Sequence, residues 1–275
     1  MRHFKTTATI LALCGVLAAC GGGDDNQQIT TLQAGSLAYG RPAAIQIAGI
    51  DLRASMTAQT GLCKDPVFNP TQSVPKLAVL NCTVTATGEQ PITIVGSNGQ
   101  VLYQGLLTVP QPQVVLNTSL GSVTLQLDPS VAPATVDNFL AYVGSGYYTN
   151  TLFHRVIPGF VAQGGGYTAG LVKKAGQRAP IALESNKGLP NIRGSLAMAR
   201  TSEPNSATSE FFINLADNPS LDYESADRPG YAVFGKVVQG QDIVDAMAAV
   251  PTSTFNSFAN VPLSDITIRF ALRSQ

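Results

Sequence analysis

The sequence predicts a mainly β protein of two domains, in which a small β-sandwich precedes a β-barrel capped by two helices. Short β-rich runs separated by turn residues occupy the chain from about residue 29 onward. Helical spacing of apolar residues occurs in two segments that lie far apart in the sequence. The 275 residues, 44% hydrophobic and 12% charged, provide enough apolar material for one large domain or two modest ones.

The first 28 residues predict export rather than a folded domain. A short basic start precedes an apolar run from Ala8 to Ala19, which is shorter than the roughly 20 residues of a membrane-spanning helix. The sequence LAAC, ending at Cys20, resembles the lipobox of bacterial lipoproteins. This resemblance implies cleavage before Cys20 and a lipid on that cysteine, and an ordinary signal peptide is the alternative. We expect a signal peptide at 1–19 and a lipidated flexible tether at 20–28.

This interpretation places the protein in the bacterial cell envelope, facing the periplasm. Gly21 lacks the aspartate that retains lipoproteins at the inner membrane in the enterobacterial sorting rule, so we expect the outer membrane. Loss of residues 1–19 removes Arg2 and Lys5 from 17 basic residues and leaves 15 against 17 acidic ones. That balance argues against a nucleic-acid partner. We expect a monomer that contacts the membrane through the lipid on Cys20.

Two cysteines remain for structural use. Cys14 lies in the signal peptide and Cys20 carries the lipid, which leaves Cys63 and Cys82. In an oxidising compartment this pair indicates a disulfide worth about 3 kcal/mol by loop-closure entropy, with two reduced buried thiols as the alternative. The mature chain keeps a single histidine, His154, so no Cys–His cluster has the spacing of a zinc site. We expect no metal and no cofactor.

Residues 29–110 are predicted to form the β-sandwich, for which an immunoglobulin-like arrangement is one candidate. The run 43–52 alternates apolar residues with polar or small ones, as half-buried strands do. Asn98 and Gly99 lie between two β-rich runs and predict a hairpin with a type I′ turn. The cysteine pair is expected to tie a loop to a strand. The proline-punctuated stretch 109–113 is the predicted domain boundary.

The barrel domain is predicted at 112–275. It opens with a hairpin at 113–127 and closes with a strand at 266–272. A first helix, opened near Pro133, is predicted from apolar residues at helical spacing, which are Val136, Phe139, Leu140 and Val143. A second helix is predicted from a shorter stripe, which consists of Ile243, Met247 and Val250.

Five stretches of this domain stand in a recognisable order. They read APATVDNFLAYVGSGYYTNTLFHRVI (132–157), FHRVIPGFVAQGGG (153–166), GSLAMAR (194–200), SATSEFFINL (206–215) and YAVFGKVVQG (231–240). Together they resemble the signature blocks of the cyclophilin-type peptidyl-prolyl isomerases. The resemblance covers about 112–273 and leaves 20–110 unexplained. It implies an eight-stranded antiparallel barrel capped by two helices, and an enzyme that isomerises X-Pro bonds of proline-containing polypeptides during protein folding in the envelope.

The resemblance also implies roles for single residues. Arg155 matches the arginine that donates a hydrogen bond to the prolyl nitrogen in the twisted transition state. Gln163 matches the glutamine that fixes the substrate carbonyl, and Tyr231 matches a position that is histidine in many eukaryotic members. The pocket for the proline ring falls on four residues, which are Phe160, Val161, Phe212 and Leu221.

The match has further positions and two departures. Ala199 and Arg200 match the strand that pairs with the substrate backbone. Val161 stands where methionine is common, and its smaller side chain implies a shallower or looser proline site. Glu210 stands where glutamine is usual and adds a negative charge near Arg155. That charge is expected either to damp the arginine or to favour basic substrates.

Other interpretations stay open beside the enzyme. The barrel could be a binding module that holds proline-containing segments with slow turnover. The departures at Val161 and Glu210 are the features that support this alternative. A purely structural lipoprotein is a third reading of the chain. Arg155 could be a surface salt-bridge partner, and Phe160 and Phe212 plain core aromatics. The enzyme is favoured, because binding alone does not require the arginine. His154 is expected to pack in the barrel rather than to catalyse.

Overall fold

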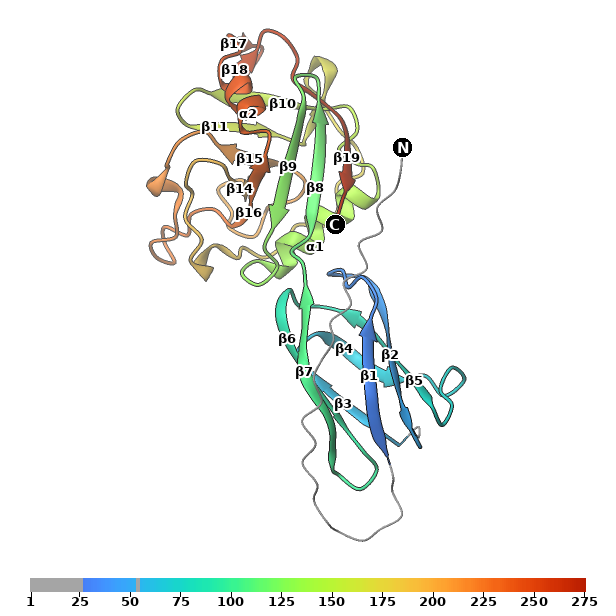
Figure 1. Ribbon diagram of the computed structural model, residues 1–275. Helices are drawn as coiled ribbons and strands as arrows, with labels where there is room; N and C mark the ends of the chain where they lie inside the picture. Colours follow the sequence, from blue (N-terminus) through green and yellow to red (C-terminus); the bar gives the residue numbers. More distant parts are fainter. Residues whose placement is uncertain (1–26, 53–54) are drawn as a thin grey trace. The chain divides into compact units, whose positions relative to one another are not determined.

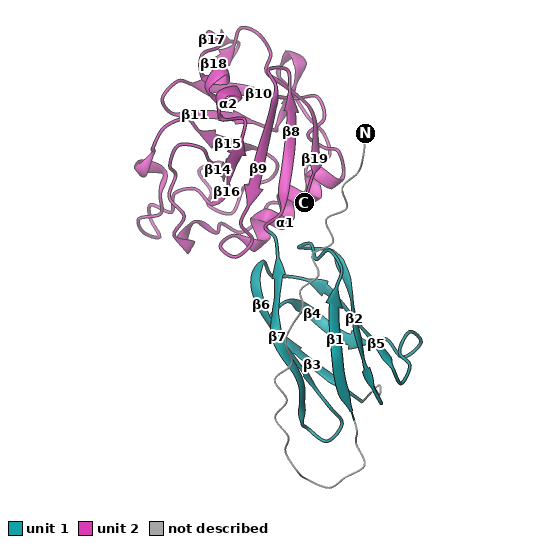
Figure 2. Ribbon diagram, viewed as in Figure 1, with its two compact units in different colours: residues 1–110 teal, residues 111–275 magenta. Residues whose placement is uncertain are grey.

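A computed structural model describes residues 27–52 and 55–275. The predicted signal peptide, Cys20 and most of the predicted tether lie outside these residues. The chain divides into two compact units at residues 110 and 111, within the proline-punctuated stretch (Figure 2). In the described ranges, no helix has both the length and the apolar character needed to cross a membrane.

The described part of the first unit contains two antiparallel sheets, with strand orders β1-β2-β5-β4 and β3-β6-β7 (Figure 1). The strands are β1 (Gln28–Ala34), β2 (Pro42–Ile50), β3 (Thr57–Thr60), β4 (Cys63–Phe68), β5 (Leu77–Val84), β6 (Gly88–Val95) and β7 (Val101–Val109). This order is the ABED and CFG arrangement of constant-type immunoglobulin domains. Gln27 is buried and accepts a hydrogen bond from the Ser97 N–H at 3.2 Å. The last two residues of the predicted tether therefore belong to this unit.

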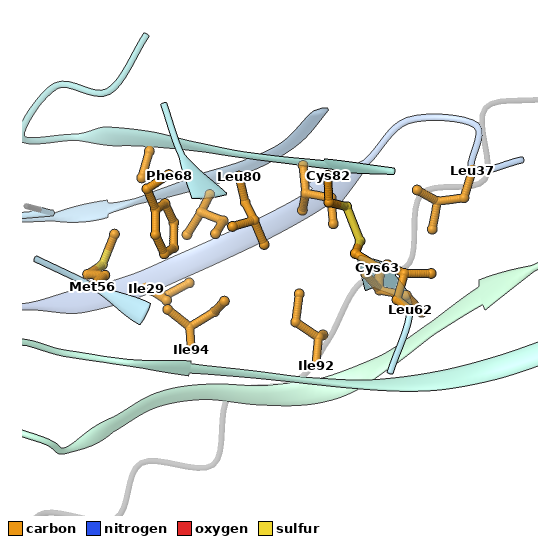
Figure 3. Close-up of a cluster of buried hydrophobic side chains, with 14 of the residues drawn as sticks. Ile29, Leu37, Met56, Leu62, Cys63, Phe68, Leu80, Cys82, Ile92 and Ile94 are labelled. Atoms are coloured by element: carbon orange, nitrogen blue, oxygen red, sulfur yellow. A yellow bond between two sulfur atoms is a disulfide. The ribbon is translucent and has the colours of Figure 1, made fainter. Parts of the chain in front are cut away.

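The two sheets of the first unit share one hydrophobic core (Figure 3). Ile29 and Leu80 come from one sheet, and Ile92 and Ile94 come from the other. Along β6 the buried Ile92 and Ile94 flank the partly exposed Thr93, because successive side chains of a strand point to opposite faces. A sheet with one buried face needs this alternation, and the pattern makes the unit a sandwich.

The disulfide between Cys63 and Cys82 is present, with Cα atoms 5.5 Å apart (Figure 3). Cys63 begins β4 and Cys82 lies on β5, its hydrogen-bonded neighbour. The bond therefore joins two adjacent strands of one sheet, and the expectation that it ties a loop to a strand is wrong. Both residues are buried in the core of the sandwich.

The predicted hairpin is formed by β6 and β7, but the predicted type of turn is wrong. A type I′ turn needs positive φ at both central residues. Gly99 has a φ of 81°, whereas Asn98 is not among the described residues with positive φ. The Gly99 N–H donates to the Gly96 carbonyl at 3.0 Å, and the Gly96 N–H donates to the Gln100 carbonyl at 2.9 Å. The strands are thus joined by a wider loop in which only the glycine adopts the left-handed conformation.

The second unit is a closed antiparallel barrel, which confirms the predicted fold class. Its strand order is β10-β11-β15-β14-β16-β9-β8-β19. The strands are β8 (Gln113–Thr118), β9 (Ser122–Leu127), β10 (Thr151–Ile157), β11 (Val161–Gly164), β14 (Ser195–Met198), β15 (Phe211–Asn214), β16 (Val233–Gln239) and β19 (Thr267–Arg273).

The loops of the barrel contain short strands and 3-10 turns. Two small sheets are formed by β12 (Tyr167–Thr168) with β13 (Val172–Lys173), and by β17 (Thr252–Phe255) with β18 (Phe258–Pro262). The 3-10 turns are η1 (Ala169–Leu171), η2 (Ser185–Lys187) and η3 (Pro219–Leu221). Of these, η3 contributes directly to the site described below.

Two α-helices lie at opposite ends of the barrel, α1 (Pro133–Gly144) and α2 (Gln241–Ala248) (Figure 1). On α1, Phe139 is fully buried against Tyr148, Phe211 and Phe234, with ring centroids 5.2, 5.4 and 5.2 Å away. The buried face of α1 agrees with the predicted stripe except that Leu140 is partly exposed. On α2 the buried residues are Val244 and Met247. The predicted stripe of α2 is therefore wrong at its ends, because Ile243 is partly exposed and Val250 lies beyond the helix.

The first turn of α1 is capped by a residue from a distant loop. Its N-cap residue, Ala132, makes no side-chain hydrogen bond to the turn. The Glu184 carboxylate instead accepts hydrogen bonds from the Ala134 N–H at 3.3 Å and from the Thr135 N–H and hydroxyl, both at 2.8 Å. A carboxylate at this end of a helix satisfies unpaired N–H groups and interacts favourably with the helix dipole.

Candidate active site

Five strands of the barrel are neighbours in the order β10, β11, β15, β14 and β16 (Figure 1). Their registers place one row of side chains across them. The residues in register along this row are Arg155, Gln163, Phe212, Ala197 and Val233. Residues directly opposite each other in a sheet point to the same face. A register shift in β10 immediately before Arg155 marks a bulge, a feature that re-aims a side chain. The sheet thus places a cation and an amide beside an apolar surface.

The apolar end of the row belongs to a compact cluster, which we call the apolar cluster. Its buried members are Val161, Ala197, Phe212 and Val233, and its partly exposed members are Phe160, Leu189, Ala199, Leu221 and Tyr231. All four residues predicted for the proline-ring pocket lie in this cluster. Leu189, Ala197 and Val233 were not predicted, because no motif in the sequence distinguishes them from other core residues.

The rim of the apolar cluster is held by Tyr231. Its ring packs edge-on against Phe212, with centroids 5.5 Å apart, and its N–H donates to the Leu221 carbonyl at 2.9 Å. The Arg200 guanidinium lies 4.7 Å from the centre of the Tyr231 ring, and its Nε donates to the Gly230 carbonyl at 3.0 Å. This cation–π contact fixes Arg200 at the edge of the cluster.

Ala199 and Arg200 do not lie in a strand, so the resemblance was wrong to assign them to one. Their pairing with a substrate backbone stays a prediction. Strand β14 ends at Met198, immediately before them. The Ala199 N–H donates to the Glu210 carbonyl at 2.9 Å, so its donor is already used inside the barrel wall. Ala199 packs against the apolar cluster instead, through its side chain.

A chain of polar side chains forms the other end of the row. Arg155 Nη1 donates to Gln163 Oε1 at 3.2 Å, and Gln163 Nε2 donates to Glu210 Oε2 at 3.0 Å. His154 Nε2 lies 3.5 Å from the same oxygen of Glu210. All four side chains are buried or partly buried. We call this set of residues the polar chain.

Burial controls the charges of the polar chain. Burial of the carboxyl group raises the pKa of Glu210, while the hydrogen bond from Gln163 and the charge of Lys173 act in the opposite direction. Burial, followed by the charge of Arg155, lowers the pKa of His154 to about 4. The imidazole packs against Tyr167 with its plane tilted by 58° and the ring centroids 4.7 Å apart, and it is neutral at neutral pH. Arg155 is therefore the cation of the polar chain.

A network of buried amides fixes the backbone of two members of the apolar cluster. Asn218 Nδ2 donates to the Phe160 carbonyl at 2.9 Å, and Asn191 Nδ2 donates to the Leu221 carbonyl at 3.0 Å. Asn214 joins them: its Nδ2 donates to Asn191 Oδ1 at 3.1 Å and its Oδ1 accepts from Asn218 at 2.7 Å. These residues were not predicted from the sequence, where their one visible signal is polar side chains beside a buried strand.

Within the described ranges, no group of three or more His, Cys, Asp or Glu side chains is placed to hold a metal ion. The row itself supplies a guanidinium held by Gln163, an oriented amide and an apolar surface with a partly exposed rim.

Comparison with known proteins agrees with this geometry. The sequence profile described as cyclophilin type peptidyl-prolyl cis-trans isomerase/CLD matches residues 113–271. Peptidyl-prolyl cis-trans isomerase A of Dickeya dadantii is 50% identical over 158 residues, which are 58% of this chain and 82% of that protein. Peptidyl-prolyl cis-trans isomerase B of Escherichia coli is 46% identical over 157 residues, which are 56% of this chain and 95% of that protein.

A solved structure gives the same result. The cyclophilin type peptidyl-prolyl cis-trans isomerase of Cryptosporidium parvum, studied in the presence of the dipeptide Ala-Pro, superposes with a TM-score of 0.51 and 30% sequence identity. The match covers 59% of this chain and 99% of that one. The barrel and the matched sequences define a peptidyl-prolyl cis-trans isomerase, an enzyme of proline-containing polypeptides. Within that class, the chain belongs to the cyclophilin type.

Proposed function

We propose that Arg155 is the catalytic residue and that the apolar cluster holds the proline ring of the substrate. The observation that carries this proposal is the register of the row, in which Arg155 and Gln163 are followed by Phe212 on the next strand. A proline ring on Phe212 and its neighbours brings the prolyl nitrogen toward the guanidinium.

The physical reason lies in amide resonance. Rotation about the X-Pro bond faces a barrier of roughly 18–20 kcal/mol, because the nitrogen lone pair is delocalised in the planar amide. In the twisted state the lone pair is localised on nitrogen and can accept a hydrogen bond. A donor from Arg155 stabilises that state and not the planar ground state, which is the requirement for catalysis without a covalent step.

The remaining residues of the site act as binding groups in this proposal. Gln163 uses one Nε2 hydrogen on Glu210 and its Oε1 on Arg155, so its second Nε2 hydrogen is available for the substrate carbonyl. The proline ring contacts Phe160, Val161, Phe212 and Leu221. Substrate backbone on either side of the proline lies beside Ala199, Arg200 and Tyr231.

The cellular setting is a second part of the proposal. We propose a monomeric lipoprotein, anchored through Cys20 in the outer membrane and facing the periplasm, where it isomerises X-Pro bonds of folding envelope proteins. The sequence features of residues 1–28 support this setting. Labelling of cells with a fatty acid, followed by membrane fractionation, tests it: Cys20→Ala is expected to lose the label and to leave the membrane fraction.

Substitution of Arg155 tests the mechanism. In a protease-coupled assay of X-Pro isomerisation, Arg155→Ala is expected to lower kcat/KM by roughly a hundredfold, as loss of a transition-state donor does in other enzymes. Arg155→Lys is expected to restore only part of the rate, since a single ammonium replaces a planar group held by Gln163. Lys236→Gln, an exposed substitution on β16, serves as the control.

Two results would contradict this mechanism. Equal rates for the parent and Arg155→Ala, at unchanged circular dichroism, would remove the arginine from the chemistry. A slow parent that still binds proline peptides as tightly as Arg155→Ala would instead favour the binding module.

A further inference from the structure

Glu210 is a partly buried acid that is linked to the proposed catalytic arginine through Gln163, and the mechanism above gives it no role of its own. Its side chain is 23% exposed and lies against Gly166, where a Cβ atom would come within 2.5 Å of Glu210 Cγ and 2.6 Å of Cδ. The absent side chain of Gly166 leaves the space that the carboxylate fills. Two nitrogen atoms, Gln163 Nε2 and His154 Nε2, face the same carboxylate oxygen.

A carboxylate in this place determines which way the Gln163 amide faces. An ionised carboxylate accepts hydrogen bonds and cannot donate them, so it selects the Nε2 end of the amide. The Oε1 end is thereby turned toward Arg155, where it accepts from Nη1 at 3.2 Å. A protonated carboxyl group, or an amide, can present a donor as well as an acceptor and does not enforce this orientation.

We propose that Glu210 is a positioning residue for Arg155, acting through the orientation of the Gln163 amide, and that the ionised form of Glu210 is the fully active one. This inference rests on the proposed role of Arg155. In this proposal the charge of Glu210 supports catalysis, so its removal lowers the rate. A charge that damped the arginine would have the opposite effect, and its removal would raise the rate.

Catalysis therefore depends on pH on the acid side of neutrality. Burial raises the pKa of Glu210 from its ordinary value of 4.5, so the rate falls on acidification at a higher pH than an exposed glutamate would give. His154 does not produce this fall, since burial lowers its pKa to about 4. The charged and titratable groups that interact with the carboxylate are His154 on β10, Tyr167 on β12, Lys173 on β13, and Tyr147 after α1. Arg155 on β10 is linked to it through Gln163.

The test is the pH profile of kcat and KM for the full chain and three variants, with X-Pro exchange in a tetrapeptide followed by NMR. The parent is expected to lose about tenfold in kcat between its neutral plateau and its acid plateau, at nearly constant KM. Glu210→Gln mimics the protonated acid, so its kcat is expected to stay near the acid plateau of the parent at every pH. If Glu210 only filled space in the site, the kcat of Glu210→Gln would not match the acid plateau of the parent.

Two lysine variants show whether the titrating group is Glu210. Lys173→Gln removes a positive charge that favours the carboxylate, so the acid fall in kcat is expected to move to higher pH. Lys236→Gln on β16 is the matched control and is expected to leave the profile of the parent unchanged. Added salt should reduce the shift caused by Lys173→Gln, since salt screens exposed charges.

The same measurements separate failure of the positioning role of Glu210 from failure of the catalytic role of Arg155. A parent that is fast at pH 8 and needs Arg155, but whose acid fall persists in Glu210→Gln, overturns the positioning role alone. A parent kcat that does not change with pH also overturns it, and so does a kcat of Glu210→Gln that is higher than that of the parent. If Arg155→Ala is as fast as the parent at pH 8, the mechanism fails first and the inference falls with it.

Discussion

His154 shows how a single buried residue makes the stability of this protein depend on pH. The folded protein resists protonation of the imidazole, because burial and the charge of Arg155 lower its pKa from 6.5 to about 4. The unfolded chain takes up that proton below about pH 6.5. Between these two values the unfolded state binds more protons than the folded state, so the free energy of unfolding falls as the pH falls.

We expect His154→Gln to remove most of this dependence. The lowered pKa corresponds to about 3 kcal/mol of stability that is present above pH 6.5 and lost by about pH 4. Urea unfolding at pH 7 and at pH 4.5, for the parent and the variant, measures the difference. If both proteins lose the same free energy between these pH values, the imidazole is not buried in its neutral form.

Residues with a motif around them could be predicted from the sequence, and residues defined only by spatial contact could not. The cluster members Phe160, Val161 and Phe212 were predicted because they stand within recognisable blocks, and Leu221 because it lies in register between two of them. The three asparagines that hold this cluster come from a loop, the end of β15 and the segment after it. Their hydrogen bonds form only when the fold brings these segments together. No local sequence pattern predicts that contact.

At the scale of elements, α1 depends on an acid that the helix itself does not contain. The Glu184 carboxylate occupies the N-terminal turn through three hydrogen bonds. Glu184→Ala is expected to lower the free energy of unfolding by about 1 kcal/mol, the usual effect of losing a helix cap. Glu184→Gln should lose less, since its carbonyl can still accept. Glu203→Ala, at an exposed acid of the next connection, between β14 and β15, should leave thermal unfolding unchanged, and an equal loss in both would contradict the capping role.

Periodicity predicted which elements exist more reliably than where they end. The apolar stripe of α1 indicated the helix and most of its buried face, but Leu140 is partly exposed while Tyr142 is buried. The β6–β7 pair was found by its β-rich runs, whereas the turn depended on hydrogen bonds of Gly96, which lies outside the Asn-Gly pair. Contacts with distant segments decide which residues of a helix are buried and how a loop closes. The local sequence does not show those contacts.

At the scale of the whole molecule, two separate cores predict two unfolding transitions. The disulfide lies in the core of the first unit, so its loss should affect that unit alone. Cys63→Ala/Cys82→Ala is expected to destabilise the sandwich by about 3 kcal/mol, the loop-closure value for this spacing. Scanning calorimetry should show one transition moved to lower temperature and one unchanged, and isomerase activity should persist. A shift of both transitions would show that the units unfold together.

The closed order of the barrel has a consequence for how the chain is made. The strand β19 pairs with both β8 and β10, and so joins the end of the domain to two strands of its first third. Ser119 and Thr267, which this closure brings into hydrogen-bond contact, are 148 residues apart. At about 5–20 residues per second, a ribosome needs roughly 7–30 s to cover that span. Until β19 is made, the edges of β8 and β10 that it covers stay unpaired, and such edges are the sites where one chain can pair wrongly with another.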